Sequence, residues 1–443
     1  MKEMAAIVLA AGKGTRMVSA KPKVLHELLG KPMIDYVLQA LRGAEVSRVV
    51  TVIGSGAEEV REHLGDACSF ALQEPQLGTG HAVMQGLPCL GPEVETVMVV
   101  CGDTPLLTKE TLQGLKTHFE ESRSSCTVLT AVLDDPAAYG RILRDDSGAL
   151  LGVVEARDAS PRQLAIQEIN SGVYCFVKKD LEEAIGSLTT GNQQGEYYLT
   201  DTIAVLRNAG KKTTAFCCGD PAEIQGVNDR CQLAEAEGLL RARKNRQLML
   251  SGVTLVDPDT VYIDAGVEVG MDTVIGPSVY IGGASRVGSG CQIGPWVKIV
   301  DSQVGDGVSV GPFAYLRPGT VLADHSKAGH FVEIKNSQIG AGSKVPHLSY
   351  IGDAELGENV NVGCGTITCN YDGVAKYRTK IGDGTFIGSN SNFIAPVEVG
   401  NRCTIGAGST ITADVPDGSL AIARSTQRII ENWAGKRKKT AKE

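Results

Sequence analysis

The amino-acid sequence predicts an α/β fold with a mostly parallel sheet in its first half, followed by a parallel β-helix of six-residue repeats. Apolar runs of strand length alternate with helical patterns in the first half, and aliphatic–glycine pairs recur every six residues in the second. The 443 residues also exceed what one ordinary core holds. With 53 glycines and only 5% aromatic residues, the composition favours a repeat architecture in which glycines occupy turns.

The first half contains continuous apolar or β-branched runs that we expect to be buried strands, at residues 7–11, 49–53, 96–101 and 125–133. The spacing of apolar residues predicts helices over 32–40 and 109–121. Strands that alternate with helices form a mostly parallel sheet covered on both faces, and ligands bind beyond the carboxyl ends of its strands. Gly12–Arg16 and Gly102-Asp103 both fall at that edge.

The second half begins after a segment of strong helix formers at 229–250, which we expect to be a connecting helix. An aliphatic residue followed by glycine then recurs at six-residue intervals, as in Ile275-Gly276 and Ile281-Gly282. In a parallel β-helix each aliphatic side chain points inward and the chain turns after it. The glycines do not recur every third residue, which excludes collagen. The predicted domains are 1–228 and 251–424, joined by the helix and followed by a tail at 425–443.

The six-residue period is interrupted between residues 322 and 339, slips by one between 351 and 356, and is interrupted again between 362 and 381. Interruptions of a solenoid's period usually correspond to loops, often on the binding face. We therefore expect irregular segments to present the polar side chains in and beside these stretches, which are Lys335, His347, Tyr350, Asn370, Tyr371 and Lys376.

Charge and cysteine content exclude several classes of protein. The net charge of −8 gives no broad basic surface for nucleic acid, and the basic run Lys436–Lys439 is expected to be a solvated terminus. The twelve cysteines are scattered, without a CxxC pair or a secretory leader, so we expect a reduced cytoplasmic protein. No apolar stretch is long enough to predict a membrane span.

The segment Leu9–Met17 has the features of a phosphate-binding loop. Its glycines let backbone N–H groups approach an anion, and Lys13, Arg16 and Lys23 can neutralise the anion's charge. The segment is not a Walker A loop, and Met17 stands where a dinucleotide-binding loop has its third glycine. An ordinary strand–helix turn remains an alternative interpretation.

A carboxylate, Asp103, directly follows a predicted buried strand. It could bind a divalent cation beside phosphates, or it could cap the helix that follows. The local pattern leaves both interpretations open.

Several segments together resemble the sugar nucleotidyltransferases: Leu9–Met17, Gln76–Ala82, Gly102–Leu106, Tyr139–Ile142, Glu168–Gly172, Glu196–Asp201 and Gly226–Asn228. Combined with the repeats, the chain resembles the GlmU family, bacterial bifunctional N-acetylglucosamine-1-phosphate uridyltransferases and glucosamine-1-phosphate N-acetyltransferases. Segments similar to the family's acetyltransferase site are Leu316–Gly319, Val332–Lys335, His347–Asp353 and Gly365–Gly373. The resemblance covers nearly the whole chain. It implies a Rossmann-like nucleotidyltransferase domain followed by a left-handed parallel β-helix.

The family's first reaction is attack of a sugar-1-phosphate on the α-phosphorus of UTP, with release of pyrophosphate. Positioning and electrostatics supply the rate in such transfers. The resemblance implies that Asp103 and Asn228 hold Mg²⁺ and that Arg16 and Lys23 stabilise the transferring phosphate. Residues implied in substrate binding are Leu9, Ala10 and Gly12 in the loop, Gln73, Gly78 and Thr79 at the uracil, and Gly140, Glu155, Asn170, Tyr198 and Thr200 at the N-acetylated sugar.

The second reaction, acetyl transfer to an amine, needs a base, a donor for the developing oxyanion and anchors for both substrates. Histidine titrates near neutral pH, but a lone histidine such as His347 is as readily structural. The resemblance implies that His347 is the base and Glu333 its charge partner, with Asn370 and Ser389 also in the catalytic site. Around glucosamine-1-phosphate it implies Arg317 and Lys335 at the phosphate, with Tyr350, Asn361, Asn370 and Lys376 at the amino sugar.

The resemblance implies that acetyl-CoA is bound by Cys364, Asn370, Tyr371, Ser389, Ala407 and Arg424. The sequence departs from the family pattern at Cys364, where a smaller alanine is expected. The added sulfur changes the local fit beside the acetyl group, although cysteine is nearly as small and can simply pack there.

We expect bifunctional synthesis of UDP-N-acetylglucosamine, in a homotrimer like other hexapeptide acyltransferases. The substrates would be UTP, glucosamine-1-phosphate, N-acetylglucosamine-1-phosphate and acetyl-CoA. A nucleotidyltransferase with a purely structural or regulatory β-helix would not need the polar cluster around His347 and Asn370. A scaffold without catalysis would not need a carboxylate and a carboxamide beside a cationic glycine-rich loop.

Overall fold

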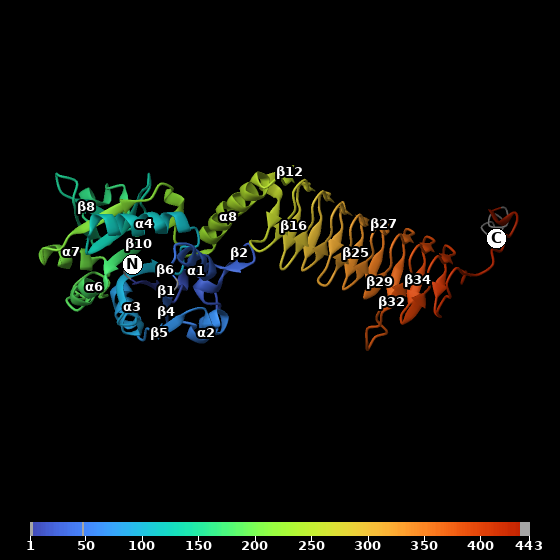
Figure 1. The fold of residues 1–443 in the computed structure, drawn as a ribbon, viewed down its shortest axis with the longest axis horizontal. Coiled ribbons are helices and arrows are strands. Elements are labelled where there is room, and N and C mark those ends of the chain that lie inside the picture. Colours follow the sequence, from blue (N-terminus) through green and yellow to red (C-terminus); the bar gives the residue numbers. More distant parts are fainter. Residues whose placement is uncertain (1–2, 47, 435–443) are drawn as a thin grey trace, which may run out of the picture. The chain divides into compact units, whose positions relative to one another are not determined.

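The computed structural model describes residues 3–46 and 48–434, so the basic run Lys436–Lys439 lies outside the described residues. The chain divides into two compact units, Met1–Leu240 and Arg241–Glu443 (Figure 1). The division falls inside the connecting helix that the sequence predicts, observed as α8 (Arg230–Leu250). Among the described helices, none combines the length and the apolar character that a membrane crossing requires.

The first unit contains one main sheet with the strand order β11-β7-β10-β6-β1-β4-β5. Its neighbours pair in parallel except β10, which runs antiparallel between β6 and β7 and also pairs with the β8–β9 hairpin. The predicted mostly parallel sheet is therefore confirmed. The strands are β1 (Glu3–Leu9), β4 (Arg48–Ile53), β5 (Ser69–Leu72), β6 (Val94–Cys101), β7 (Cys126–Val132), β8 (Arg141–Arg144), β9 (Leu150–Val154), β10 (Glu168–Val177) and β11 (Thr213–Cys217), with a separate pair β2 (Glu27–Leu28) and β3 (Lys31–Pro32).

Both faces of this sheet are covered, as strand β1 shows. Its successive side chains alternate between two hydrophobic cores, with Ala6 and Val8 in one and Ala5 and Ile7 in the other. Helices α1, α2 and α4 pack on the first core, and α3, α6 and α7 on the second. The helices are α1 (Met33–Gly43), α2 (Ala57–Leu64), α3 (Thr79–Gly86), α4 (Lys109–Ser122), α5 (Pro161–Leu164), α6 (Lys178–Ile185) and α7 (Asp201–Asn208).

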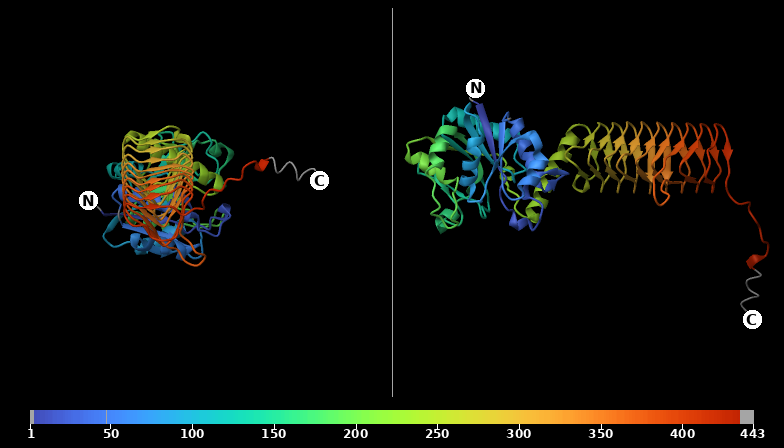
Figure 2. Two further views of the ribbon diagram at one scale, coloured as in Figure 1. Left: turned by 90° about the vertical axis from the view of Figure 1, so that its right-hand side faces the viewer. Right: turned by 90° about the horizontal axis from the view of Figure 1, so that it is seen from below.

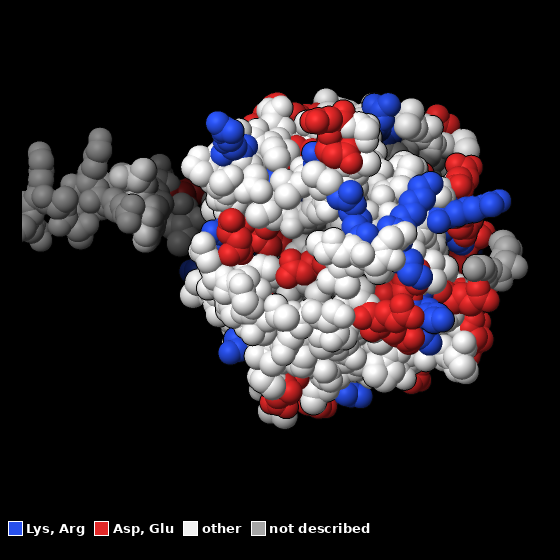
Figure 3. Space-filling model, turned by 90° about the vertical axis from the view of Figure 1, so that its left-hand side faces the viewer, with Lys and Arg blue, Asp and Glu red and all other residues white. Residues whose placement is uncertain are grey.

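The surface of this unit carries charges of both signs. On the face drawn in Figure 3, Lys and Arg side chains are interspersed with Asp and Glu side chains. This mixture differs from the continuous basic surface that nucleic-acid binding requires.

The second unit is a parallel β-helix whose short strands form three long sheets, with successive coils stacked along one axis (Figures 1 and 2). The first sheet contains β12 (Thr254–Leu255), β15 (Val274–Ile275), β18 (Gln292–Ile293), β21 (Ser309–Val310), β24 (Lys327–His330), β27 (Lys344–His347), β30 (Asn361–Val362), β33 (Phe386–Ile387), β36 (Thr404–Ile405) and β38 (Leu420–Ala421). The second contains β13 (Tyr262–Ile263), β16 (Tyr280–Gly282), β19 (Lys298–Val300), β22 (Tyr315–Leu316), β25 (Glu333–Lys335), β28 (Tyr350–Gly352), β31 (Ile367–Cys369), β34 (Asn392–Ile394) and β37 (Thr410–Ile411). The third contains β14 (Glu268–Val269), β17 (Arg286–Val287), β20 (Gln303–Val304), β23 (Val321–Leu322), β26 (Gln338–Ile339), β29 (Ala354–Leu356), β32 (Thr379–Ile381) and β35 (Val397–Val399).

The six-residue period corresponds to one strand and one corner of each coil. The aliphatic residues of the repeat line a continuous core, in which Ile275, Ile281 and Ile293 are at most 2% exposed. Parallel pairing stacks each of these side chains on its counterpart in the next coil, as Ile275 stacks on Ile293. The core of this unit is therefore a column of aliphatic layers.

Two of the predicted interruptions are not loops: residues 322–339 continue the coil, and the slip between 351 and 356 lies in β28 and β29, which pair in register with β25 and β26. Between residues 322 and 339 the coil continues through β24 and β25, with Ala328 and Ile334 fully buried at the inward positions. The pattern was hidden because Ala328 is small. The segment that contains His347 is likewise regular, since β27 and β28 pair with β24 and β25 in register.

The third interruption is a real insertion. The chain uses 25 residues between Ile367 and its partner Asn392, against 17 between Tyr350 and its partner Ile367. The extra residues lie between β31 and β32 and include Asn370, Tyr371 and Lys376. The prediction that a loop presents these three side chains is therefore confirmed, whereas Lys335, His347 and Tyr350 project from regular coils.

Close approach of neighbouring coils makes a glycine necessary at one position in β24. A Cβ atom at Gly329 would overlap the carbonyl group of Pro346 in β27, whereas one at Gly266 would meet no heavy atom within 4 Å. We predict that Gly329→Ala lowers the free energy of unfolding of the β-helix by about 1–3 kcal/mol, because the coils must separate. Gly266→Ala is the matched control and should change it by less than about 0.5 kcal/mol. Denaturant melts of both variants provide the measurement, and equal stabilities would contradict this packing argument.

Candidate active sites

The glycine-rich loop and Asp103 emerge at the same edge of the first unit's sheet. Strands β1 and β6 are parallel, with Leu9 opposite Cys101, and Gly102 donates its N–H to the Leu9 carbonyl at 2.9 Å. A cavity of about 470 Å³ opens beyond these strand ends. It is lined by Leu9, Ala10, Ala11, Gly12, Lys13, Lys23, Val24, Gln73, Gln76, Gly78, Thr79, Ala82, Cys101, Asp103 and Glu196.

Lys23 brings the two predicted metal ligands together. Its ammonium group forms an ion pair with Asp103 and donates to Asn228 Oδ1 at 3.2 Å. The N–H of Val227 donates to the Asp103 carbonyl at 2.9 Å, and Asn228 Nδ2 donates to the Gly226 carbonyl at 3.3 Å. The amide oxygen of Asn228 and the carboxylate of Asp103 therefore both contact the Lys23 ammonium.

The glycine-rich loop packs closely against Lys23 at Gly14. Gly14 has a φ of 58°, and a Cβ atom there would lie 2.7 Å from the Lys23 Cβ. The next residues form a short turn, η1 (Thr15–Met17), on which Arg16 is exposed. Among the described residues, the cavity wall includes Lys13 and Lys23 but not Arg16.

The predicted uracil-binding residues form one wall of the cavity. The buried Gln73 donates from Nε2 to the Gly78 carbonyl at 2.9 Å, and Thr79 Oγ1 accepts the N–H of Leu199 at 3.1 Å. Gly78 has a φ of 101°, and a Cβ there would lie 2.7 Å from the Tyr197 carbonyl oxygen. These three residues are therefore packed against the segment that carries Tyr198 and Thr200.

The predicted sugar-binding residues meet in two pairs. Asn170 donates its N–H to the Gly140 carbonyl at 2.9 Å, and Thr200 Oγ1 donates to Glu155 at 3.2 Å. Burial raises the pKa of Glu155, although the Thr200 hydroxyl opposes this shift. Tyr198, two residues before Thr200, is buried as well.

Sequence reasoning missed a contact that joins the loop to the Asn228 segment. Arg230 donates from Nε to the Met17 carbonyl and from Nη1 to His26 Nδ1, both at 3.2 Å. Arginine can only donate, so His26 must accept and is neutral in this contact. Burial is the main cause that lowers the pKa of His26, and the charges of Arg230 and Lys21 lower it further.

In the second unit, four of the residues predicted at the acetyl-CoA site follow one corner of the β-helix, whereas Asn370 and Tyr371 lie in the inserted loop. The residue after Ser389 donates its N–H to the Cys364 carbonyl at 2.7 Å, and the residue after Ala407 donates to the Ser389 carbonyl at 2.8 Å. Arg424 Nη1 then donates to the Ala407 carbonyl at 2.5 Å. These contacts link the corners of successive coils. His347 lies in the coil before Cys364, since β27 pairs with β30.

Three cations gather where strands of the second sheet end, since Arg317 follows β22, Lys335 ends β25 and Lys376 lies in the loop after β31. The ammonium of Lys376 lowers the pKa of the half-buried Lys335, and Arg317 lowers it further. Arg317 also forms an ion pair with Glu333 at 2.7 Å. Glu333 was predicted to be the charge partner of His347, but the structure pairs it with Arg317. A bound anion would relieve the repulsion within the cation cluster.

Hydrogen bonds to Asp353 anchor the base of the inserted loop. Its carboxylate accepts from Asn336 Nδ2 at 2.5 Å and from Nδ2 of the buried Asn370. Tyr371 is 59% exposed, and its hydroxyl donates to the Gly373 carbonyl of the same loop at 2.6 Å.

The two remaining predicted sugar residues lie on strands. Tyr350 pairs with Glu333 across β25 and β28, and Asn361 pairs with Lys344 across β27 and β30. Both side chains are half-buried.

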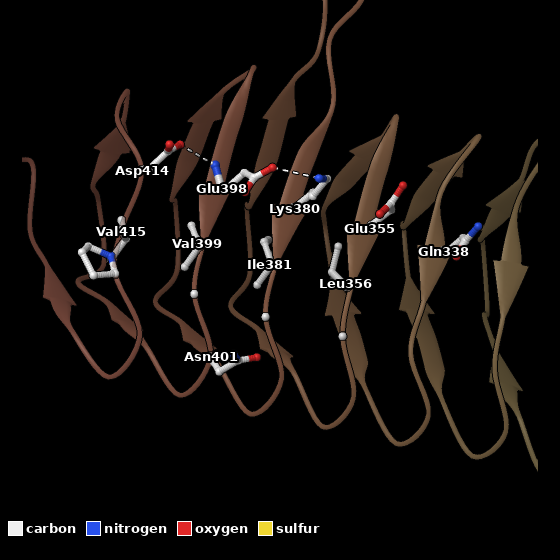
Figure 4. Close-up of a pocket in the computed structure, with 14 residues that line it drawn as sticks. Gln338, Glu355, Leu356, Lys380, Ile381, Glu398, Val399, Asn401, Asp414 and Val415 are labelled. Atoms are coloured by element: carbon white, nitrogen blue, oxygen red, sulfur yellow. Dashed lines mark hydrogen bonds and ion pairs between the residues drawn. The ribbon is translucent and has the colours of Figure 1, made fainter.

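A further cavity, of about 530 Å³, opens on the third sheet of the β-helix (Figure 4). The side chains of Lys380 and Glu398 pair at 2.8 Å, and the carboxylate of Asp414 accepts the backbone N–H of Glu398 at 2.8 Å. Glu355 pairs with Arg378, outside the cavity. The described residues that line it include none of those predicted for a site.

Comparison with known proteins matches both halves of the chain. The family described as MobA-like NTP transferase domain matches residues 6–168, and bacterial transferase hexapeptide repeats match residues 378–413. "Bifunctional protein GlmU" of Heliobacterium modesticaldum is 54% identical, over 99% of each chain. The protein of the same name from Pelobacter propionicus is 51% identical over 99% of this chain and 100% of that one. This chain belongs to the GlmU family. The predicted resemblance is confirmed, and so is the fold class, a Rossmann-like domain followed by a left-handed hexapeptide β-helix.

The His26–Arg230 contact in this GlmU-family chain predicts a pH dependence of stability. A histidine whose pKa is lowered by folding binds its proton more readily in the unfolded chain. Its stabilising contribution is full above the unfolded pKa of about 6.5 and is lost as pH falls below that value toward the lower folded pKa. We predict that the free energy of unfolding of the first unit decreases as the pH falls below about 6.5. His26→Gln should flatten this dependence in denaturant melts, and an unchanged slope would contradict the assignment.

Proposed function

We propose that the two sites described above catalyse the successive steps that make UDP-N-acetylglucosamine. The chain is a bifunctional transferase of the GlmU family, with acetyltransferase and uridyltransferase activities. The observation that supports the uridylyl site best is the convergence of Asp103, Asn228 and Lys23 at the strand ends beside the glycine-rich loop. For the acetyl site it is the cluster of Arg317, Lys335 and Lys376, because Lys335 lies in the coil next to that of His347 and Lys376 follows in the coil of Cys364.

Mg²⁺ fits the first site because its donors are a carboxylate and an amide oxygen, hard ligands that leave room for water and phosphate. Lys23 already places a positive charge between Asp103 and Asn228, so the pocket accommodates a cation there. When bound, the metal would neutralise the phosphates of UTP. Lys23, Lys13 and the backbone N–H groups of the loop would hold the same phosphates, with Arg16 reaching in from η1.

The substrates extend from the phosphates in two directions. Gln73, Gly78 and Thr79 would contact the uracil, because they form one wall of the same cavity. Glu155, Asn170 and Thr200 would hold the N-acetylated sugar so that its phosphate oxygen lies in line with the α-phosphorus. Holding both reactants in one geometry supplies the rate without a protein nucleophile.

Acetyl transfer requires that the amine lose a proton as it attacks. In the proposed step, a C–N bond forms at the thioester carbonyl, the C–S bond breaks, and His347 accepts the amine proton and passes it to the coenzyme A thiolate. Arg317, Lys335 and Lys376 would hold the sugar phosphate, with Tyr350, Asn361 and Asn370 at the amino sugar. Cys364, Tyr371, Ser389, Ala407 and Arg424 would hold acetyl-CoA.

Reciprocal variants test the assignment of each activity to its own site. Asp103→Asn should abolish uridylyl transfer, because Mg²⁺ would lose its carboxylate ligand and the phosphates would no longer be neutralised. The same variant should leave acetyl transfer intact. His347→Ala should lower the kcat of acetyl transfer by about a hundred- to ten-thousand-fold and spare uridylyl transfer. Pyrophosphate release and free-thiol release measure the two reactions separately, and melting curves check folding.

Two outcomes would count against the proposal. Loss of both activities in a folded Asp103→Asn enzyme would contradict separate sites. A His347→Ala enzyme with near-normal kcat and a raised KM would make His347 a binding residue instead of the base.

We also propose that the protein is a cytoplasmic homotrimer. The cysteines of the described structure are free thiols, as expected in a reducing compartment. Large apolar side chains follow the corner between the first two β-helix sheets, where Trp296, Phe313, Phe331 and Leu348 are 48–60% exposed. The Phe313 and Phe331 rings stack with their centroids 5.0 Å apart. An exposed apolar row of this kind is typical of a protein interface, and three-fold closure is an allowed symmetry.

The trimer proposal predicts that charges placed on this row dissociate the assembly. Phe313→Asp combined with Phe331→Asp should reduce the mass measured by light scattering from trimer to monomer and lower acetyl transfer, whereas uridylyl transfer should persist. Met271→Asp is the control, because Met271 is 62% exposed at another corner. An active wild-type monomer at assay concentration would contradict the proposed trimer.

A further inference from the structure

A second histidine stacks on the ring of the proposed base. His330 in β24 is the register partner of His347 in β27. Their ring centroids are 5.6 Å apart and the ring planes differ by 9°. Both side chains are exposed at the ends of their strands, just before the corner between the first and second sheets. Aromatic ring pairs with centroids about 4.5–7 Å apart stabilise a structure by more than the burial of their surface alone.

The backbone around the two rings is held closely. The N–H of Leu348, the residue after His347, donates to the His330 carbonyl at 2.9 Å. Gly329, the residue before His330, has no space for a Cβ atom because the carbonyl of Pro346 occupies it. The backbone positions of both histidines are therefore set by direct contacts between the adjacent residues of the two strands.

A catalytic base usually has its ring oriented by a third group, most often a hydrogen-bond partner. Within the described residues, the structure gives the His347 ring no hydrogen bond, and Glu333 is engaged by Arg317. The contact that it does give the ring is the stack on His330.

We propose that His330 is a positioning residue for acetyl transfer: its ring holds the plane of the His347 imidazole so that a ring nitrogen faces the attacking amine. This inference rests on the proposed role of His347 as the base. His330 touches neither substrate in this account. It reduces the rotation of the His347 ring, and a misdirected base lowers the rate without weakening substrate binding.

Two variants distinguish the contribution of the flat ring of His330 from that of its polar nitrogen atoms. His330→Gln keeps length and polarity but removes the flat ring, and should lower the kcat of acetyl transfer about two- to tenfold with both KM values unchanged. His330→Phe keeps the ring and should return kcat to within about twofold of the wild type. His325→Asn is the matched control, since His325 is an exposed histidine in the turn just before β24.

A spectroscopic measurement tests the stack independently of turnover. In protein labelled at histidine, the ring-proton signals of His347 should shift in His330→Gln, because the ring current of the neighbour is lost. They should stay unchanged in His325→Asn. Uridylyl transfer and the melting curve should be the same in all three variants.

The outcomes distinguish this inference from the proposed function. If His347→Ala retains acetyl transfer, the base assignment fails and the positioning role of His330 fails with it. If His347→Ala is inactive but His330→Gln has wild-type kcat, only the positioning role is overturned. A KM increase in His330→Gln, or equal losses in the Gln and Phe variants, would likewise overturn it, because a positioning ring predicts neither.

Discussion

Parallel strand pairing is the constraint on which both sites depend. Parallel strands bring their carboxyl ends to one edge, so in the first unit Leu9 lies opposite Cys101 and the segments that follow them meet. In the β-helix the same pairing repeats in every coil and stacks residues that occupy equivalent positions. His330, His347 and Cys364 belong to successive coils for that reason, although the residues between them form two other sheets. The polar side chains in each site are thus placed by a backbone whose own energy comes from apolar layers.

Close backbone approach then sets how precisely the side chains are placed. Gly14 lets the glycine-rich loop lie against Lys23, Gly78 lets the predicted uracil-binding wall lie against the Tyr197 carbonyl, and Gly329 lets β24 lie against β27. None of these glycines carries chemistry. Each removes a Cβ atom where two segments distant in sequence must touch, and each therefore couples packing to the geometry of a site.

Cationic side chains are a second feature common to the two units, but their surroundings differ. Lys23 is balanced by the Asp103 carboxylate, whereas Lys335 lies near two other cations, Lys376 and Arg317. Like charges held near one another oppose the charged state until an anion arrives. A substrate that carries phosphate would supply that anion in the proposed acetyl transfer.

The sequence by itself determined the architecture. The aliphatic–glycine period predicted the β-helix because each short strand needs one inward aliphatic residue, which is a local requirement. The continuous apolar runs predicted the parallel sheet because its strands are buried on both faces. It also predicted that Asp103 and the loop share an edge, because strand direction alone decides this. Only the tertiary structure decided which side chains meet: that Glu333 pairs with Arg317, that Arg230 joins Met17 to His26, and that His330 stacks on His347. It also showed that residues 322–339 form regular coils, because Ala328 fills an inward position whose small side chain leaves no signal in the pattern. Such contacts depend on strand register and on packing between residues that are distant in the sequence, so the local sequence pattern does not predict them.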